Sequence, residues 1–273
     1  MNDDQSAKAA RFRSLHERPG AFVIPNVWDG GSAAIMAGLG FEALATSSSA
    51  AAGTLGKLDG GLTRDEALAH ACAVVATSAL PVSADLEQGF GDSPETVAET
   101  IRRAAAAGLV GGSIEDASGD ERAPIFEMPL AVERIAAAVA AARKLPFPFT
   151  LTARAENYLH GRADLDDTVR RLQAFERAGA DVLFAPGLPD LAAVRTVCQS
   201  LSKPVNFMVG IRGRSFSVAE LVHAGVRRIS LSTSLYRAAM TGLYAAGREV
   251  KESGTFGYLE TIMSGKDLAG FLG

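Results

Sequence analysis

The sequence alternates short apolar runs with longer amphipathic or alanine-rich segments eight times between residues 21 and 252. This alternation predicts parallel strands joined by crossover helices, because each strand of such a sheet is buried on both faces. The expected strands are 22–27, 43–46, 82–86, 112–115, 149–153, 182–185, 205–209 and 229–232. The expected helices between and after them are 31–37, 64–78, 94–107, 129–144, 165–178, 190–201, 218–224 and 236–252.

Eight such units favour an α/β fold of the closed (β/α)8 TIM-barrel type over an open sheet. A chain of 273 residues has the size of one such barrel, so residues 1–273 are expected to form a single domain. No Gly-x-Gly-x-x-Gly motif follows the first expected strand, which disfavours a dinucleotide-binding fold. Helix starts and ends are also marked, by Thr63, Ser93, Asp164 and Ser217 as N-caps and by Gly108, Gly179 and Gly225 as stops.

Two segments lie outside the eight units. Residues 1–20 contain an expected N-terminal helix that would cover one end of the barrel. Residues 254–273 form an apolar tail for which the barrel has no remaining face, so we expect a C-terminal helical tail that packs on another subunit or across the barrel bottom. Packing on another subunit would make the protein a homo-oligomer.

Composition excludes several classes of function. The 27 basic and 31 acidic residues give a net charge of −4, and no basic run could follow a nucleic-acid backbone. No apolar run has the length needed to span a membrane. The N-terminal sequence lacks the layout of a signal peptide, so a cytoplasmic protein is expected, with neither nucleic acid nor membrane as a partner.

The segment 83–90, Ser-Ala-Asp-Leu-Glu-Gln-Gly-Phe, carries the clearest chemical signal. Strand alternation places Asp85 and Glu87 on the same side at a strand end. Two adjacent carboxylates are costly there unless a cation neutralises them, and hard divalent cations prefer oxygen ligands of this kind. The alternative is a surface turn with solvated acids.

Polar residues follow several other expected strands, and the carboxyl ends of barrel strands share one face. Four or five acids and one arginine at a single mouth favour a metal site. Arg154 could bind a substrate carboxylate, or it could form an ion pair with Glu115 or Glu156. The residues at the strand ends are Thr46, Ser47, Ser48, Ser49, Asp59, Asp85, Glu87, Glu115, Asp116, Arg154, Glu156, Asn157, Asn206, Ser232, Thr233 and Ser234.

Five motifs together resemble the isocitrate lyase and phosphoenolpyruvate mutase superfamily: 25–29 (PNVWD), 46–49 (TSSS) with Asp59, 83–89 (SADLEQG), 113–116 (SIED) and 152–154 (TAR). The resemblance implies that Asp85 ligates Mg²⁺ directly, with Mn²⁺ as the alternative ion. It implies that Asp59, Glu87 and Glu115 hold the waters of the metal. The resemblance further implies that the backbone amides of Ser48 and Ser49 form an oxyanion hole, with Ser47 beside them in the same catalytic and substrate-binding site, and that Arg154 and Asn206 contact the substrate. It also implies a homo-oligomer, either a dimer or a tetramer, with the C-terminal tail exchanged between subunits.

The shared chemistry of that superfamily makes or breaks a C–C or P–C bond beside a 2-oxo acid through an enolate. Its lyases carry a Lys-Lys/Arg-Cys-Gly-His segment after the fourth strand, and its phosphonate enzymes carry a lysine and an asparagine there. In this chain the corresponding residues 117–127, ASGDERAPIFE, include no cysteine, lysine or asparagine. The sixth strand ends in 185–187, APG, where the methylisocitrate lyases have a glutamate. What remains favours a lyase or decarboxylase that cleaves a C–C bond of a small 2-oxo or 2-hydroxy di- or tricarboxylate, with oxaloacetate or a methylisocitrate-like acid as the substrate. The alternatives are phosphonopyruvate-type P–C chemistry and a non-catalytic protein that binds 2-oxo acids.

Overall fold

A computed structural model describes residues 3–272 and shows one parallel sheet in the order β1-β9-β8-β7-β6-β5-β4-β3-β2. β1 and β2 are halves of one strand interrupted at Pro25, since β1 pairs with β9 and β2 pairs with β3. This interrupted strand joins both edges of the sheet, so the predicted eight-stranded barrel is confirmed. The strands are β1 (Phe22–Ile24), β2 (Asn26–Val27), β3 (Leu44–Thr46), β4 (Val82–Asp85), β5 (Gly111–Glu115), β6 (Thr150–Arg154), β7 (Val182–Phe184), β8 (Val205–Met208) and β9 (Arg228–Ser230).

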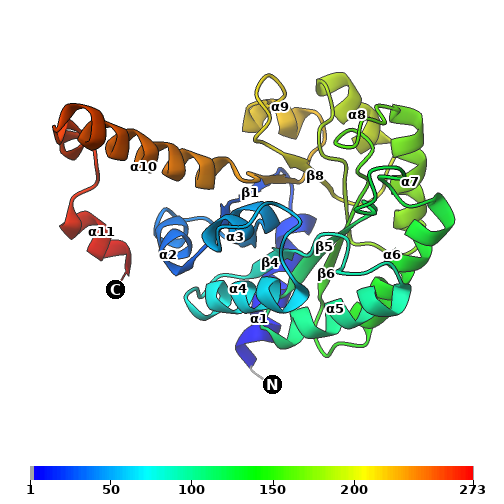
Figure 1. Cartoon of the computed structure of the whole chain (residues 1–273). Coiled ribbons are helices and arrows are strands. Elements are labelled where there is room, and N and C mark those ends of the chain that lie inside the picture. The colour runs from blue at the N-terminus through cyan, green and yellow to red at the C-terminus, as the bar shows by residue number, and fades with distance from the viewer. Residues whose placement is uncertain (1–2, 273) are drawn as a thin grey trace.

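Helices surround the barrel and leave the carboxyl ends of the strands open (Figure 1). None of the helices within residues 3–272 combines the length and apolar character needed to cross a bilayer. The helices are α1 (Asp3–Glu17), α2 (Gly30–Gly38), α3 (Ser48–Thr54), α4 (Arg64–Ala76), α5 (Pro94–Ala106), α6 (Met128–Arg143), α7 (Leu165–Arg177), α8 (Leu191–Gln199), α9 (Val218–His223), α10 (Ser234–Ser253), the 3₁₀ helix η1 (Gly257–Glu260) and α11 (Gly265–Leu272).

Local capping explains why the predicted boundaries agree with the structure to within two residues. The four predicted N-caps each accept a hydrogen bond from a backbone amide of the first helical turn. Gly108, Gly179 and Gly225 have φ values of 90°, 102° and 100°, which a residue with a side chain rarely adopts. The sequence did not reveal α3, because its start at Ser47-Ser48-Ser49 was interpreted as a loop.

α1 closes the amino-terminal end of the barrel and buries His16 between the rings of Phe12 and Phe22. The Nδ1 atom of His16 lies 2.9 Å from the carbonyl oxygen of Phe12, so this nitrogen is the donor. Its Nε2 atom then faces Arg228 at 3.4 Å as an acceptor. Burial, together with the charge of Arg228, lowers the pKa of His16 to about 3.

This depressed pKa predicts a loss of stability in acid. The unfolded state protonates His16 near pH 6.5 and the folded state only near pH 3, so the free energy of unfolding falls as the pH falls through this window. The contribution is about 2 kcal/mol between pH 7.5 and pH 5. We therefore expect the stability difference between the wild type and His16→Gln to shrink by this amount in urea unfolding at the two pH values. A difference independent of pH would show that His16 has the same pKa in the folded and the unfolded state.

The C-terminal segment leaves the barrel instead of covering it. α10 extends away from the strands, and α11 returns to pack beside α2, where the Phe271 ring lies against Gly38 (Figure 1). No residue of α10, η1 or α11 is buried. Large apolar side chains of this segment therefore remain exposed, among them Leu243, Tyr244, Phe256, Leu259, Ile262 and Leu272.

Candidate active site

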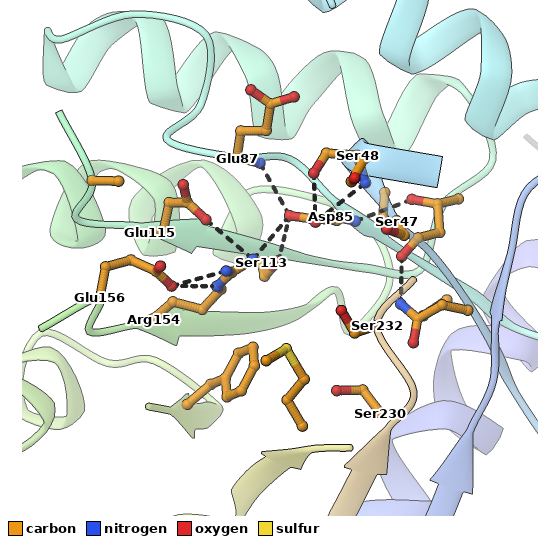
Figure 2. Close-up of a pocket in the computed structure, with 18 of the residues that line it drawn as sticks. Ser47, Ser48, Asp85, Glu87, Ser113, Glu115, Arg154, Glu156, Ser230 and Ser232 are labelled. Carbon is orange, nitrogen blue, oxygen red and sulfur yellow. Dashed lines mark hydrogen bonds and ion pairs between the residues drawn. The ribbon is translucent and has the colours of Figure 1, made fainter. Parts of the chain in front are cut away.

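A cavity of about 480 Å³ opens at the carboxyl ends of the strands. Its walls come from the ends of β3, β4, β5, β6, β8 and β9 and from the loops that follow them. Figure 2 shows the side chains converging on this space from several strands. The residues to which the family resemblance gives a role all line it: Ser47, Ser48, Ser49, Asp59, Asp85, Glu87, Glu115, Arg154 and Asn206. Of the other residues predicted at the strand ends, Thr46, Glu156, Ser232 and Thr233 also line the cavity, whereas Asp116, Asn157 and Ser234 do not.

Asp85, the last residue of β4, lies at the centre of the hydrogen-bond network (Figure 2). Its Oδ2 atom accepts hydrogen bonds from the amide of Ser48 at 3.3 Å and from the hydroxyl of Ser48 at 3.0 Å. Its Oδ1 atom lies 3.2 Å from Nη1 of Arg154 and accepts from the amide of Glu87 at 3.3 Å. Donors from three segments therefore fix the orientation of this carboxylate.

The serine segment enters the site through the start of α3. The hydroxyl of Ser47 caps α3 by accepting from the amide of Ala50 at 3.4 Å. This cap directs the amide and hydroxyl of Ser48 toward Asp85, and the same hydroxyl lies 3.2 Å from Oδ1 of Asp59. Because the Ser48 amide is already donating to Asp85, an oxyanion would have to compete with this carboxylate for the amide.

Arg154, the last residue of β6, pairs with three carboxylates at once. Its Nη1 atom lies 3.1 Å from Glu115 and 3.2 Å from Asp85, and its Nη2 atom lies 2.8 Å from Glu156. Burial alone would lower the pKa of this guanidinium, but the three carboxylates outweigh it and the pKa is raised. The structure thus contains the ion pair that the sequence left as an alternative to substrate binding.

The other acids of the cavity are held in an unfavourable electrostatic environment. Burial first, and the charge of Asp85 second, raise the pKa of Asp59 and bring that of Glu87 to about 7. Burial also holds the pKa of Glu115 well above its usual range. Glu87 has a φ of 50°, and its Oε1 atom is buried with no hydrogen-bond partner among the described residues. A backbone strained in this way persists only where the surrounding structure holds it.

These features fit a hard divalent cation. An ion near Asp85 would offset the repulsion between the acids and lower their pKa values, and the unpaired oxygen of Glu87 could bind one of its waters. Within residues 3–272, no three side chains of His, Cys, Asp or Glu lie close enough to ligate one ion together. The arrangement therefore suits one directly ligating carboxylate surrounded by acids that bind water, because Mg²⁺ usually retains several waters.

The model of the phosphoenolpyruvate phosphomutase family matches residues 12–251, which include the whole barrel and every residue of this network. The chain belongs to this family. The resemblance seen in the sequence motifs is thereby confirmed, and the chain is an enzyme of the lyase and mutase class. Members of the family typically depend on a divalent metal, in agreement with the acids around Asp85.

Individual relatives point to lyases and decarboxylases. The chain is 30% identical to 2-methylisocitrate lyase of Escherichia coli over 214 residues, which are 75% of this chain and 71% of the lyase. It is also 30% identical to oxaloacetate decarboxylase of Bradyrhizobium diazoefficiens over 206 residues, 73% of this chain and 70% of that enzyme. A crystal structure of a candidate lyase/mutase from Burkholderia cenocepacia J2315 has 52% identity and a TM-score of 0.97, and the match covers 99% of this chain and 97% of that one.

The loop after β5 differs from the lyase pattern in this phosphomutase-family enzyme. It forms a short hairpin in which Ala117 pairs with Ile125, and only Ala117 and Gly119 of its residues line the cavity. Arg171 fixes its base by donating to Asp116 at 3.1 Å and to the carbonyl of Phe126 at 2.9 Å. The part of the loop nearest the cavity therefore supplies no acidic or basic side chain.

Sequence reasoning missed Arg228 and Ser230, which line the cavity from β9. Asn206 on β8 donates to the hydroxyl of Ser230 at 3.0 Å and accepts from Nε of Arg228 at 2.9 Å. The period of two along a strand contained a signal, since it places both β9 residues on the same side. Arg228 is the first residue of β9, so it lies away from the strand ends at which the other site residues were predicted. His160, in the loop after β6, also lines the cavity, with Nε2 3.9 Å from Glu156.

Proposed function

We propose that this protein is a Mg²⁺-dependent carbon–carbon lyase or decarboxylase that acts on a small 2-oxo or 2-hydroxy dicarboxylate through an enolate. Mn²⁺ offers the same coordination chemistry and is the alternative ion. The observation that carries the proposal is the central position of Asp85, held by Ser48 and Arg154 in a cavity where Asp59, Glu87 and Glu115 have raised pKa values. The names of the relatives support the reaction class.

The hairpin after β5 favours a reaction that needs no thiol acid. In decarboxylation of oxaloacetate the C3–C4 bond breaks, its electron pair moves toward the C2 carbonyl, CO₂ leaves, and C3 then takes up one proton to give pyruvate. Asp85 would hold a divalent cation, which would supply the Lewis acid that stabilises negative charge on the enolate oxygen. Asp59, Glu87 and Glu115 would bind its waters, while Arg154 keeps Asp85 and Glu115 in place.

The direct test is turnover of a panel of oxaloacetate, methylisocitrate, isocitrate and phosphonopyruvate, with Mg²⁺ and with chelator. We expect metal-dependent pyruvate from oxaloacetate, well above the rate of the metal alone. Succinate from methylisocitrate or isocitrate would instead favour a tricarboxylate lyase, and pyruvate with phosphate from phosphonopyruvate would favour P–C chemistry. Thermal stabilisation by a 2-oxo acid, with no product from any substrate of the panel, would contradict the proposed reaction. It would favour the alternative of a non-catalytic protein that binds 2-oxo acids.

We further propose that the C-terminal segment, residues 254–273, joins subunits into a dimer or tetramer. The exposed apolar side chains of α10, η1 and α11 support this, because such patches on a soluble protein usually mark interfaces. Deletion of residues 255–273 is expected to lower the mass in solution, measured by light scattering. An unchanged mass would exclude these residues from the interface.

A further inference from the structure

Arg228 is a buried cation without an acidic partner. Only 5% of the residue is exposed, and it lines the cavity from within β9. Among the residues that the structure describes, its hydrogen-bond partners are the Asn206 carbonyl, the Thr152 hydroxyl and the His16 ring. The Asn206 and Thr152 side chains carry no charge, and the depressed pKa of His16 keeps its ring uncharged near neutral pH, so all three partners are neutral. Burial with no compensating carboxylate lowers the pKa of Arg228 to about 9.

A buried charge without a partner of opposite sign is costly, and an anion bound beside the Arg228 guanidinium would remove this cost. Arg154, the other arginine of the cavity, cannot serve a substrate without giving up a partner, since Asp85, Glu115 and Glu156 already surround it. Arg228 has no such competitor. Its guanidinium carries five N–H groups, and the three recorded hydrogen bonds leave two of them for a ligand.

The sequence of β9 places a hydroxyl next to this charge. Arg228 and Ser230 lie on the same side of the strand, and the register sets Arg228 beside Asn206 of β8. Nε of Arg228 donates to the carbonyl of Asn206, which orients the amide of Asn206 so that it donates to Ser230 at 3.0 Å. The Ser230 hydroxyl accepts this bond, and its own proton can turn from a long contact of 3.5 Å with the carbonyl of Phe207 to an anion in the cavity.

The cavity is therefore electrically divided. Asp59, Asp85, Glu87 and Glu115 make one part acidic and suited to a cation, whereas Arg228 makes the part against β8 and β9 basic. Figure 2 shows Ser230 across the cavity from Asp85 and Glu87. The volume of about 480 Å³ can hold a four-carbon acid together with a metal ion and several waters.

We propose that Arg228 and Ser230, aligned by Asn206, form the subsite that binds the second carboxylate of the substrate. This inference rests on the proposed function, in which the 2-oxo or 2-hydroxy carboxylate group binds at the metal beside Asp85. It makes Arg228 the residue that selects dicarboxylates over monocarboxylates. A substrate with one carboxylate would leave the buried guanidinium uncompensated.

The test compares malate with lactate, which share the 2-hydroxy carboxylate group and differ in the second carboxylate. Affinities of the full-length protein are measured by calorimetry with saturating Mg²⁺. We expect the wild type to bind malate more tightly than lactate. Arg228→Met should weaken the binding of malate by roughly 30-fold and that of lactate by less than about threefold. The reason is that only malate loses a hydrogen bond to a charged group.

Two further variants separate recognition from folding. Arg228→Lys keeps the charge and should restore part of the malate affinity. Ser230→Ala should lower the affinity for malate roughly fivefold and leave the affinity for lactate unchanged. Ile135→Ala is the stability control: Ile135 is a buried residue of α6 outside the cavity, so this variant should lose thermal stability but keep the wild-type ratio of malate to lactate affinity.

The outcomes distinguish this inference from the function on which it rests. Equal losses of malate and lactate in Arg228→Met would overturn the subsite and give Arg228 a structural role in the barrel. Malate affinity unchanged in that variant would also overturn it, while metal-dependent turnover by the wild type would leave the proposed function standing. A wild type that does not prefer malate over lactate would refute both the subsite and the dicarboxylate substrate.

Discussion

Replacing Asp85 by alanine is expected to abolish the thermal stabilisation of the protein by Mg²⁺ and to reduce metal-dependent turnover by at least about 100-fold. Loss of residues that only support metal ligands already costs about 10- to 100-fold, so a direct ligand should cost no less. The loss of Asp85 should also lower the pKa values of Asp59 and Glu87, because its charge helps to raise both. The measurement is the change in Tm on titration with Mg²⁺, together with turnover of the preferred substrate.

Asp120→Ala is the matched control, since Asp120 is an acid of the β5 hairpin that does not line the cavity. It should keep both the Mg²⁺ response and the activity. A wild-type Mg²⁺ response in Asp85→Ala would show that the ion, if it binds, has another ligand. A variant that lost activity but still responded to Mg²⁺ would confine Asp85 to orienting the Ser48 amide and Arg154.

The barrel could be predicted because each level of the sequence agreed with the others. Strand and helix periodicity, the capping residues and the glycine stops all act locally, so they can be recognised without knowledge of distant contacts. The site residues followed from the topology, since parallel strands in a barrel bring their carboxyl ends to one face. This is why Ser48, Asp85 and Arg154 could be placed together although they lie far apart in the chain.

Features that depend on tertiary contacts were beyond the sequence. α3 is a short helix capped by Ser47, and a run of three serines favours loops as readily as helix starts. The unpaired charge of Arg228 becomes visible only when its neighbours are known to be Thr152, Asn206 and His16, which come from three separate elements. Likewise, the sequence could name Glu115 and Glu156 as partners of Arg154, but not show that it binds both together with Asp85.

Replacing Arg154 by methionine is expected to have the largest effect on stability of any single change in the site. The substitution leaves Asp85, Glu115 and Glu156 as buried carboxylates without their shared cation, a change that typically costs about 3–5 kcal/mol. Mg²⁺ can replace part of the lost charge. We therefore expect a lower free energy of unfolding without metal and a larger rise in Tm on adding Mg²⁺ than in the wild type.

Arg171→Met provides the matched control, because Arg171 is also a largely buried arginine and pairs with Asp116 and Asp167 outside the cavity. It should lose stability as well, yet keep the wild-type rise in Tm with Mg²⁺, since the acids it leaves unpaired do not face the metal site. Arg154→Lys should recover only part of the stability, as a single ammonium cannot reproduce the planar fork that reaches three carboxylates. If Mg²⁺ raised the Tm of Arg154→Met no more than that of Arg171→Met, the acids around Arg154 would not be the ones that respond to the ion. Arg154 would then stabilise the mouth of the barrel independently of the metal. Any role of Asp85, Glu115 and Glu156 in catalysis would then have to come from contacts with the substrate and not from the metal ion.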